Sequence, residues 1–171
     1  MGKWNRFDYP DHCLVARSTV IHKTAVIGPD SMSIKVDEKQ KKLIQFEHQG
    51  GICINEDVRI GPLSVIHRAT LEGKETVIKS GTHIGTMVNI GHNSVIGHDC
   101  VIVSGTNIGG SVQIGDDVWI GMDVSIKPHV KICSHAVIGI GSVVINDIDK
   151  SGVYVGNPAR YIRERGEGKP L

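Results

Sequence analysis

The chain has 171 residues, the length of a single domain, since domains commonly span about 100–200 residues. It contains 23 Ile and 20 Val but only 5 Leu and 5 Ala, and 21 residues are Gly. β-Branched residues favour strands, whereas Leu and Ala favour helices. This composition excludes a helix bundle and argues against a doubly wound α/β sheet. With 40% hydrophobic residues, the chain also differs from intrinsically disordered proteins.

Charge and cysteine content exclude several classes of partner. The net charge is +1 with His neutral, so no overall field attracts nucleic acid or an anionic membrane. No apolar run approaches the roughly 18 residues of a membrane span. Residues 1–12 are polar and of mixed charge, unlike a secretory signal. The four cysteines form no C-x-x-C pair and are expected to be free thiols in a reducing compartment. We therefore expect a cytoplasmic protein with neither a nucleic-acid partner nor a membrane span.

Hydrophobic residues recur every six positions in the first predicted element, residues 15–28. They are Val15, Ile21 and Ile27, and a period of six belongs neither to a helix nor to an alternating strand. The next segment, residues 29–50, is charged and lacks this period. We expect it to leave the coil as an external loop or hairpin over one face. The register of the first element is offset by three residues from the series that follows.

The longest predicted element, residues 51–146, carries the same period throughout. Every sixth position from 54 to 144 is Ile at fourteen of sixteen places, and only Glu72 breaks the apolar series. A small or β-branched residue often stands two positions before the Ile, and Gly often follows it. We interpret each hexad as a short strand and a turn, with the Ile and the small residue pointing inward. Gly in the turn provides either a positive φ or a close approach of two backbones.

Three such hexads make one triangular coil of 18 residues, and successive coils stack about 4.8 Å apart. Hexapeptide repeats of this kind predict a parallel β-helix, an all-β fold. Residues 51–146 are then expected to form a little over five coils with no insertion. The period is lost in residues 147–171, where we expect a loop and a short helix that cap the open end. The whole chain, 1–171, is predicted to be a single domain.

Because Ile fills the interior, chemistry is expected on the outside of the prism. His92 stands at a corner, and an imidazole with an unperturbed pKa near 6.5 can take a proton from an amine or hydroxyl group. Gly110 follows 18 residues later, one coil along, where its backbone N–H can stabilise an oxyanion. His129 is two coils along and one residue across, roughly 10 Å away on the same face. That distance suits contact with another part of a long substrate. Together the three residues form a candidate site.

A family resemblance rests on these residues. The stretch 90–97, Ile-Gly-His-Asn-Ser-Val-Ile-Gly, runs without a gap into 109–115 and resembles the catalytic coils of the left-handed β-helix acyltransferases. It is most similar to the UDP-3-O-acylglucosamine N-acyltransferases of lipid A synthesis, and it also resembles the sialic-acid and bacillosamine acetyltransferases. The similarity covers most of residues 15–145. It implies a left-handed coil, His92 as general base, oxyanion binding by the Gly110 amide, and a homotrimer with sites between subunits.

Differences between this sequence and these families affect the predicted acyl donor and the predicted general base. The lipid A enzymes have an N-terminal uridine-binding domain, which the fourteen residues before Val15 are not expected to supply, and a longer helical extension suited to acyl carrier protein. Residues 155–163 instead resemble the tail of coenzyme-A-dependent hexapeptide acetyltransferases. Asn93 stands where the acetyltransferases usually have an acidic residue, and an uncharged partner orients His92 without stabilising its cation as strongly. The residues implied to contact the donor are His129, Lys127, Asn157 and Arg160.

These observations predict an acyltransferase that moves an acetyl or short acyl group from acyl-CoA to an amino or hydroxyl group of a nucleotide-linked sugar, with no bound cofactor. Three alternatives stay open: an acyl-carrier-protein-dependent N-acyltransferase of lipid A type, a γ-carbonic-anhydrase-like zinc enzyme, and a non-catalytic β-helix scaffold. The spacing of His92 and His98 counts against zinc. Residues six apart lie on adjacent faces, diverge, and cannot share one tetrahedral ion within a chain.

Overall fold

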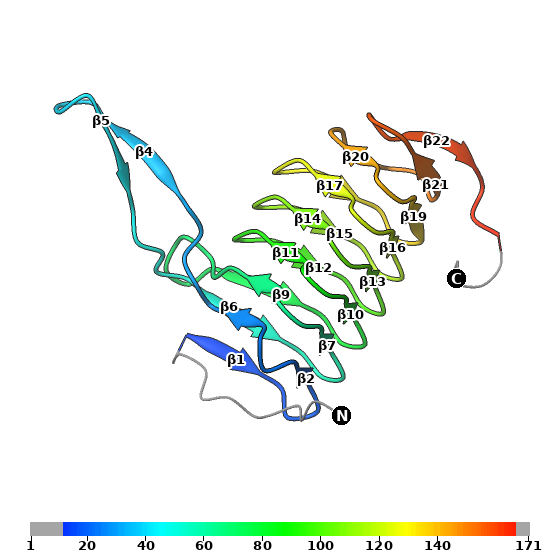
Figure 1. Cartoon of the computed structure of the whole chain (residues 1–171), viewed down its shortest axis with the longest axis horizontal. Coiled ribbons are helices and arrows are strands. Elements are labelled where there is room, and N and C mark those ends of the chain that lie inside the picture. Colours follow the sequence, from blue (N-terminus) through cyan, green and yellow to red (C-terminus); the bar gives the residue numbers. More distant parts are fainter. Residues whose placement is uncertain (1–11, 167–171) are drawn as a thin grey trace.

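The computed structural model describes residues 12–166, and that part of the chain contains strands but no helix. Most strands are two residues long, and three successive strands complete one turn of a triangular coil. Figure 1 shows the coils stacked into a prism. Residues 1–11, most of the polar start considered above, and residues 167–171, the end of the predicted cap, lie outside the described residues. Within residues 12–166, no helix is long and apolar enough to cross a membrane.

Three parallel sheets form the faces of the prism. Sheet A contains β1 (Cys13–Val15), β6 (Gly51–Ile54), β9 (Glu75–Ile78), β12 (Val95–Ile96), β15 (Gln113–Ile114) and β18 (Lys131–Ile132). Sheet B contains β2 (Val20–Ile21), β7 (Arg59–Ile60), β10 (His83–Ile84), β13 (Val101–Ile102), β16 (Trp119–Ile120), β19 (Ala136–Ile138), β21 (Gly152–Val155) and β22 (Arg160–Arg163). Sheet C contains β3 (Val26–Ile27), β8 (Val65–Ile66), β11 (Asn89–Ile90), β14 (Asn107–Ile108), β17 (Ser125–Ile126) and β20 (Val143–Val144).

The hexad Ile residues fill the interior, as predicted. Ile90, Ile96 and Ile102 are completely buried, and each pairs in register with the Ile one coil above. The residue two positions earlier is also buried, and several of these residues carry a hydroxyl group that donates to a corner carbonyl. Thr82 and Ser94, for example, donate hydrogen bonds to the carbonyl oxygens 15 residues ahead, at 2.7 and 3.0 Å. Buried hydroxyl groups thus find partners inside an otherwise apolar column.

The Gly residues after the hexad Ile are required by close packing of successive coils. A Cβ on Gly91 would lie 2.5 Å from the backbone nitrogen of Gly110. A Cβ on Gly109 would lie 2.6 Å from the backbone nitrogen of Pro128. Of the two roles predicted for these glycines, close backbone approach is therefore the one observed. The positive φ falls two residues later in each turn, for example at Asn93 with φ 60°.

One prediction about the coils is wrong, because the second coil contains an insertion. Ile54 pairs with Ile78, 24 residues later, whereas Ile78 pairs with Ile96, only 18 residues later. The six additional residues form part of a longer connection between β8 and β9, residues 67–74, which we call the inserted loop. Because the insertion is one whole hexad, it leaves the six-residue period of the sequence unchanged, so the period alone does not show it. Glu72, the single break in the Ile series, lies in this loop.

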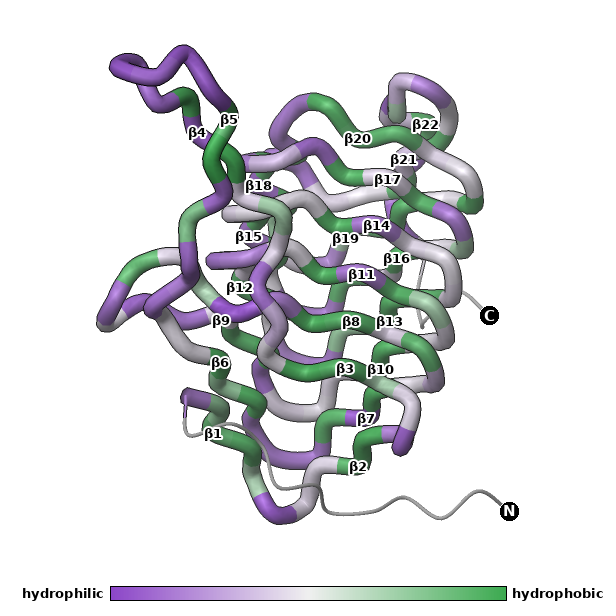
Figure 2. Tube along the Cα trace, turned by 60° about the vertical axis from the view of Figure 1, so that its left-hand side comes forward, coloured by the Kyte–Doolittle hydropathy of each residue, from purple (hydrophilic) through white to green (hydrophobic). Residues whose placement is uncertain are grey.

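The segment 29–50 between the first two coils forms an antiparallel hairpin of β4 (Ile34–Asp37) and β5 (Lys42–Gln45). Figure 1 shows the hairpin projecting from the stacked coils, and Figure 2 shows its hydrophilic tip far from them. Strands β1 and β6 pair at an offset of 39 residues, as for Cys13 and Ile52. That offset is not a multiple of six, which explains the shifted register of the first coil.

The C-terminal part also differs from its prediction, because it contains no short helix within the described residues. Strand β21 continues sheet B in parallel, and β22 folds back on it in antiparallel fashion. The sequence of β21 is rich in Val and Tyr, which favour strands. Gly156 allows the turn between the two strands, with φ 98°, and the rings of Tyr154 and Tyr161 pack edge to face at 5.6 Å. This hairpin covers one end of sheet B.

Candidate active site

His92, Gly110 and His129 lie in one column of turns. Each turn connects sheet C to sheet A in a successive coil, after β11, β14 and β17 respectively. The turns are joined by backbone hydrogen bonds: the Ser111 N–H donates to the His92 carbonyl at 2.7 Å, and the His129 N–H donates to the Gly110 carbonyl at 3.0 Å. The structure therefore brings the three residues together in the order that the spacing predicts. His98, by contrast, lies at the next corner, between sheets A and B.

The ring of His92 is held in one tautomer by its neighbours. Its Nδ1 lies 2.8 Å from Oδ1 of Asn93. The same oxygen accepts hydrogen bonds from the backbone N–H of Thr70 at 3.2 Å and from its hydroxyl at 2.9 Å. A backbone N–H can only donate, so this Asn93 atom is an acceptor and Nδ1 of His92 must carry the proton. In the neutral ring, Nε2 is then left with its lone pair, as a general base requires.

Nε2 of His92 faces Gly110. A Cβ built on Gly110 would lie 2.6 Å from Nε2, 2.7 Å from Cε1 and 3.0 Å from Cδ2 of this ring. Gly110 thus differs from Gly91 and Gly109, whose nearest neighbours include backbone atoms of the next coil. Only a residue without a side chain leaves the imidazole in its observed place.

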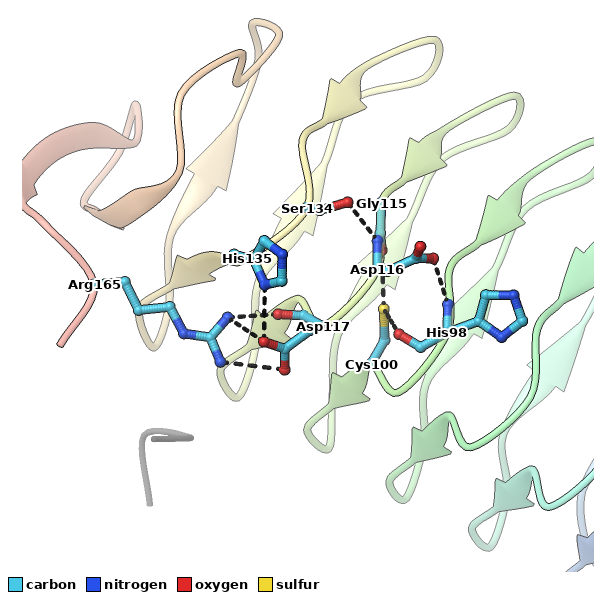
Figure 3. A network of polar contacts seen from close by, with 8 residues as sticks. All are labelled: His98, Cys100, Gly115, Asp116, Asp117, Ser134, His135 and Arg165. Atoms are coloured by element: carbon cyan, nitrogen blue, oxygen red, sulfur yellow. Dashed lines mark hydrogen bonds and ion pairs between the residues drawn. The ribbon is translucent and has the colours of Figure 1, made fainter. Parts of the chain in front are cut away.

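The Gly110 N–H has no partner among the described residues, and the sequence of the next coil explains why. At other corners, a turn N–H donates to the side chain 18 residues ahead: His98 to Asp116 at 2.8 Å and Asp116 to Ser134 at 2.9 Å. Figure 3 shows both interactions. For Gly110 the residue 18 positions ahead is Pro128, which offers no side-chain acceptor. The N–H beside His92 is therefore left available for an oxygen atom of a ligand.

An open cleft of about 570 Å³ surrounds this corner. Its polar residues are Ser33, Thr70, Lys74, His92, Asn93, Ser111 and His129. Its apolar residues are Met32, Ile34, Phe46 and Leu71. The apolar side chains come from the 29–50 segment and the inserted loop, so these two additions to the regular coil form one wall of the cleft.

The residues implied to contact the donor lie at two corners. Lys127 and His129 are exposed in the turn after β17, in the column of His92. Asn157 and Arg160 are also exposed, but Asn157 lies in the turn between β21 and β22 and Arg160 directly follows it. This turn is hydrogen-bonded to Val143 of β20. That turn lies where sheet B meets sheet C. Within one chain, the structure does not bring Asn157 and Arg160 to the corner of His92.

Sequence patterns missed three residues that shape the site. Thr70 is in the inserted loop, and the break of the Ile series at Glu72 was the available signal for it. Thr76 accepts a hydrogen bond from the backbone N–H of Asn93 at 2.8 Å. His48 lies in the external segment, its ring 5.6 Å from that of His92. No periodicity links His48 to the site, since its contact depends on how a hairpin folds back.

A second polar cluster lies at the corner between sheets A and B, away from His92 (Figure 3). Asp117 forms an ion pair at 3.0 Å with Arg165, and its Oδ2 also lies 3.0 Å from Nδ1 of His135. Arg165 comes from the end of the described chain and also donates to the Asp117 carbonyl at 2.6 Å. This contact attaches the C-terminal segment to the prism. Among residues 12–166, no group of three or more His, Cys, Asp or Glu side chains is arranged to hold a metal ion.

The cysteines occupy structural positions. All four are free thiols. Cys100 is completely buried, and its thiol takes the place of the usual hydroxyl by donating to the Gly115 carbonyl at 3.1 Å. Burial raises the pKa of Cys100 to about 11, which keeps it protonated and unreactive at neutral pH.

The comparisons with known proteins agree with this architecture. The family model for the bacterial transferase hexapeptide, described as six repeats, matches residues 111–146. A solved structure of a UDP-N-acetylglucosamine acyltransferase superposes with a TM-score of 0.74 at 28% identity, covering 86% of this chain and 54% of that one. This chain is a left-handed parallel β-helix of hexapeptide repeats. Its handedness, which the hexad period alone leaves open, follows from the match.

Curated relatives carry acyltransferase names. The chain is 35% identical over 136 residues to a UDP-3-O-acylglucosamine N-acyltransferase of Coxiella burnetii, covering 80% of this chain and 39% of that protein. It is 35% identical over 153 residues to a probable mitochondrial UDP-3-O-acylglucosamine N-acyltransferase 2 of Arabidopsis thaliana, covering 90% and 49%. The chain thus spans less than half the length of these relatives. AntD, an N-acyltransferase of Bacillus cereus, shares the fold with a TM-score of 0.66 at 20% identity, covering 90% and 84%.

Proposed function

We propose that this protein is an acyltransferase that moves an acetyl or short acyl group from acyl-CoA to an amino group of a nucleotide-linked sugar. The observation that carries the proposal is the pairing of His92 with Gly110. In its neutral form the His92 imidazole presents the lone pair of Nε2 beside a backbone N–H that has no partner within the described residues. A base and an oxyanion donor at one point are what acyl transfer from a thioester needs.

In the proposed mechanism, the acceptor nitrogen attacks the thioester carbonyl while Nε2 of His92 removes its proton. The carbonyl oxygen becomes an oxyanion, and the Gly110 N–H donates a hydrogen bond to it. Collapse of this intermediate breaks the carbon–sulfur bond and forms the amide. His92 then returns the proton to the leaving thiolate of coenzyme A. Asn93 keeps Nδ1 as the donor throughout, so Nε2 is the nitrogen that exchanges the proton.

The acceptor is proposed to occupy the part of the cleft formed by the 29–50 segment and the inserted loop. That wall combines apolar side chains with the Lys74 ammonium group, a combination that suits a sugar linked to a phosphate. The donor is proposed to extend along the same corner towards Lys127 and His129. Similar proteins support these classes: N-acyltransferases of UDP-linked glucosamine, and AntD in complex with dTDP and 3-hydroxybutyryl-CoA.

A homotrimer is part of the proposal. Asn157 and Arg160 lie at a different corner from His92 within one chain, so they can contact the same donor only if they come from a neighbouring subunit. A site between subunits of a trimer supplies both corners. Sedimentation or light scattering of the purified protein measures this state directly.

Activity is tested with purified protein, acetyl-CoA and a panel of amino-sugar nucleotides, by following release of the coenzyme A thiol. Product is expected with at least one acceptor, and His92→Ala is expected to reduce its formation to a small residual rate. His98→Ala, which removes an exposed histidine at another corner, is the matched control and should keep full activity. Full activity of His92→Ala would refute the assignment of the base.

A longer acyl chain delivered by acyl carrier protein is the second candidate. One observation favours it: a largely apolar hollow of about 510 Å³ on sheet A, lined by residues that include Val95, Ile114 and Ile132. These strands directly follow the corner of His92, so a hydrocarbon chain leaving the corner has an apolar surface to cover. A series of acyl donors of increasing length, offered on coenzyme A and on acyl carrier protein, decides between the two candidates.

A further inference from the structure

His48 is a buried histidine at the base of the projecting hairpin. Only 4% of His48 is exposed. Its backbone N–H donates to Oδ2 of Asp30 at 3.0 Å, and this hydrogen bond joins the segment that enters the hairpin to the segment that leaves it. Its Nδ1 lies 3.1 Å from the carbonyl oxygen of Arg68 in the inserted loop. His48 thus connects the two segments that interrupt the regular coils.

The hydrogen bonds of His48 fix its ring completely. A carbonyl oxygen can only accept, so Nδ1 must carry the proton that it donates to Arg68. In the neutral ring, Nε2 then accepts a hydrogen bond from the Ser33 hydroxyl at 2.8 Å. Both nitrogens are therefore engaged, and His48 is absent from the residues that line the cleft. It has no free atom with which to act on a substrate.

The remaining contact of this fixed ring is with the proposed base. The centroids of His48 and His92 are 5.6 Å apart, and the ring planes cross at 80°. This is the edge-to-face geometry that aromatic rings favour. Asn93 holds His92 through Nδ1, whereas His48 restricts the plane of its ring.

The inserted loop reinforces this arrangement. Gln49 and Gly50, directly after His48, donate backbone hydrogen bonds to Thr70 and Ala69 of the loop at 3.1 and 3.0 Å. Thr70 is also the residue that donates to Asn93. The two additions to the coil are thus joined to each other, and each one contacts a different side of the His92–Asn93 pair.

We propose that His48 is a positioning residue for the acyl transfer, acting through its edge-to-face contact with His92. This inference rests on the proposed function, since it assigns His48 to the base of that reaction. Loss of the ring lets the imidazole of His92 rotate away from the Gly110 N–H. The consequence is a lower kcat, with binding of both substrates preserved.

Two substitutions separate the ring contact from the hydrogen bonds. His48→Gln keeps groups that can bond Arg68 and Ser33 but removes the ring, and it is expected to lower kcat about 10- to 100-fold. His48→Phe keeps the ring without its nitrogens and should retain more of kcat than His48→Gln. Ser31→Ala removes a hydroxyl that lies 3.4 Å from Nε2 of His48 and does not line the cleft; it is the control for a hydrogen bond alone and should keep kcat. KM for both substrates should stay within about two-fold in each variant.

A double mutant tests whether the effect passes through the base. In a His92→Ala background, His48→Gln should cause no further loss of the residual rate, because the residue through which it acts is gone. An equal loss in both backgrounds, or a folded His48→Gln protein with wild-type kcat, would overturn the proposal. So would a retention of kcat by His48→Gln that exceeds that of His48→Phe.

A measurement without turnover keeps this inference separate from the proposed function. The imidazole ¹⁵N resonances of His92 should show one Nδ1–H tautomer in the wild-type protein and averaged values in His48→Gln. Identical resonances in the two proteins would contradict the positioning role. If no donor yields product with the wild-type protein, the proposed function fails, while these resonances still decide whether His48 orders His92.

Discussion

Gly110→Ala places the proposed chemistry under a direct geometric test. The added methyl carbon would lie 2.6 Å from Nε2 and 2.7 Å from Cε1 of His92. Non-bonded heavy atoms are optimally separated by about 3.5–4.0 Å, so the imidazole must retreat by about 1 Å. A misplacement of that size can cost about 100-fold in rate, equivalent to about 2.7 kcal/mol in the activation barrier. We expect kcat to fall by about this factor.

The stability of Gly110→Ala should not fall with its activity. Gly110 has no positive φ, and replacing Gly by Ala at a compatible position stabilises a protein by about 0.4–1 kcal/mol through the unfolded chain. Thiol release gives kcat, and thermal melting gives Tm. Gly91→Ala is the contrasting variant, because its Cβ meets backbone 2.5 Å away and should lower Tm. Wild-type kcat in Gly110→Ala would refute the reasoning, and so would a Tm that falls as far as that of Gly91→Ala.

Three further predictions concern the base, the core and the buried thiol. Asn93→Ala should lower kcat about 10-fold because Nδ1 loses its acceptor, whereas Asn93→Asp, which keeps an oxygen acceptor, should remain active in the same thiol-release assay. Ile96→Ala, at a fully buried position, should destabilise the protein by about 2–5 kcal/mol in urea unfolding, while Ile140→Ala, which is 69% exposed, should stay within about 0.5 kcal/mol. The pKa of Cys100 is raised from an ordinary 9.0 to about 11 in the folded protein. As the pH rises, the unfolded state therefore loses the thiol proton of Cys100 before the folded state does. Stability should therefore fall as pH rises from about 9 to about 11, and a Cys100→Ala protein should show a smaller fall in urea unfolding at pH 8, 9 and 10.

The repeated part of the fold was predictable because one physical requirement recurs at every coil. Each interior position admits one branched apolar side chain, so the six-residue period of Ile90, Ile96 and Ile102 predicts that they are buried. The column of His92, Gly110 and His129 follows from the same arithmetic, since residues 18 apart stack. Where the chain follows the repeat, the number of residues between two positions therefore predicts which of them stack on each other.

The interruptions were not predictable, for the same reason. The inserted loop contains one additional hexad, so the period continues through it without a shift, and only Glu72 marked the place. The C-terminal hairpin was expected to be a loop and a short helix because it lacks the repeat, although the β-favouring residues 153–155 argue for strands. His48 reaches His92 through a hairpin whose path depends on tertiary packing. The parts of the site that were missed are those that the repeat does not encode.

A stack of coils is also expected to unfold locally from its ends. Each coil contacts only the coil above and the coil below, so its stability is approximately a sum over neighbours, and opening begins at the two ends. Backbone amides of β1 and β20 should exchange with solvent sooner than those of β11 and β14, which flank the turns of His92 and Gly110. We therefore expect the proposed reaction centre to lie among the slowly exchanging coils. The cleft wall formed by the 29–50 segment and the inserted loop is attached to the early coils, so its opening would also release the contact of His48 with His92.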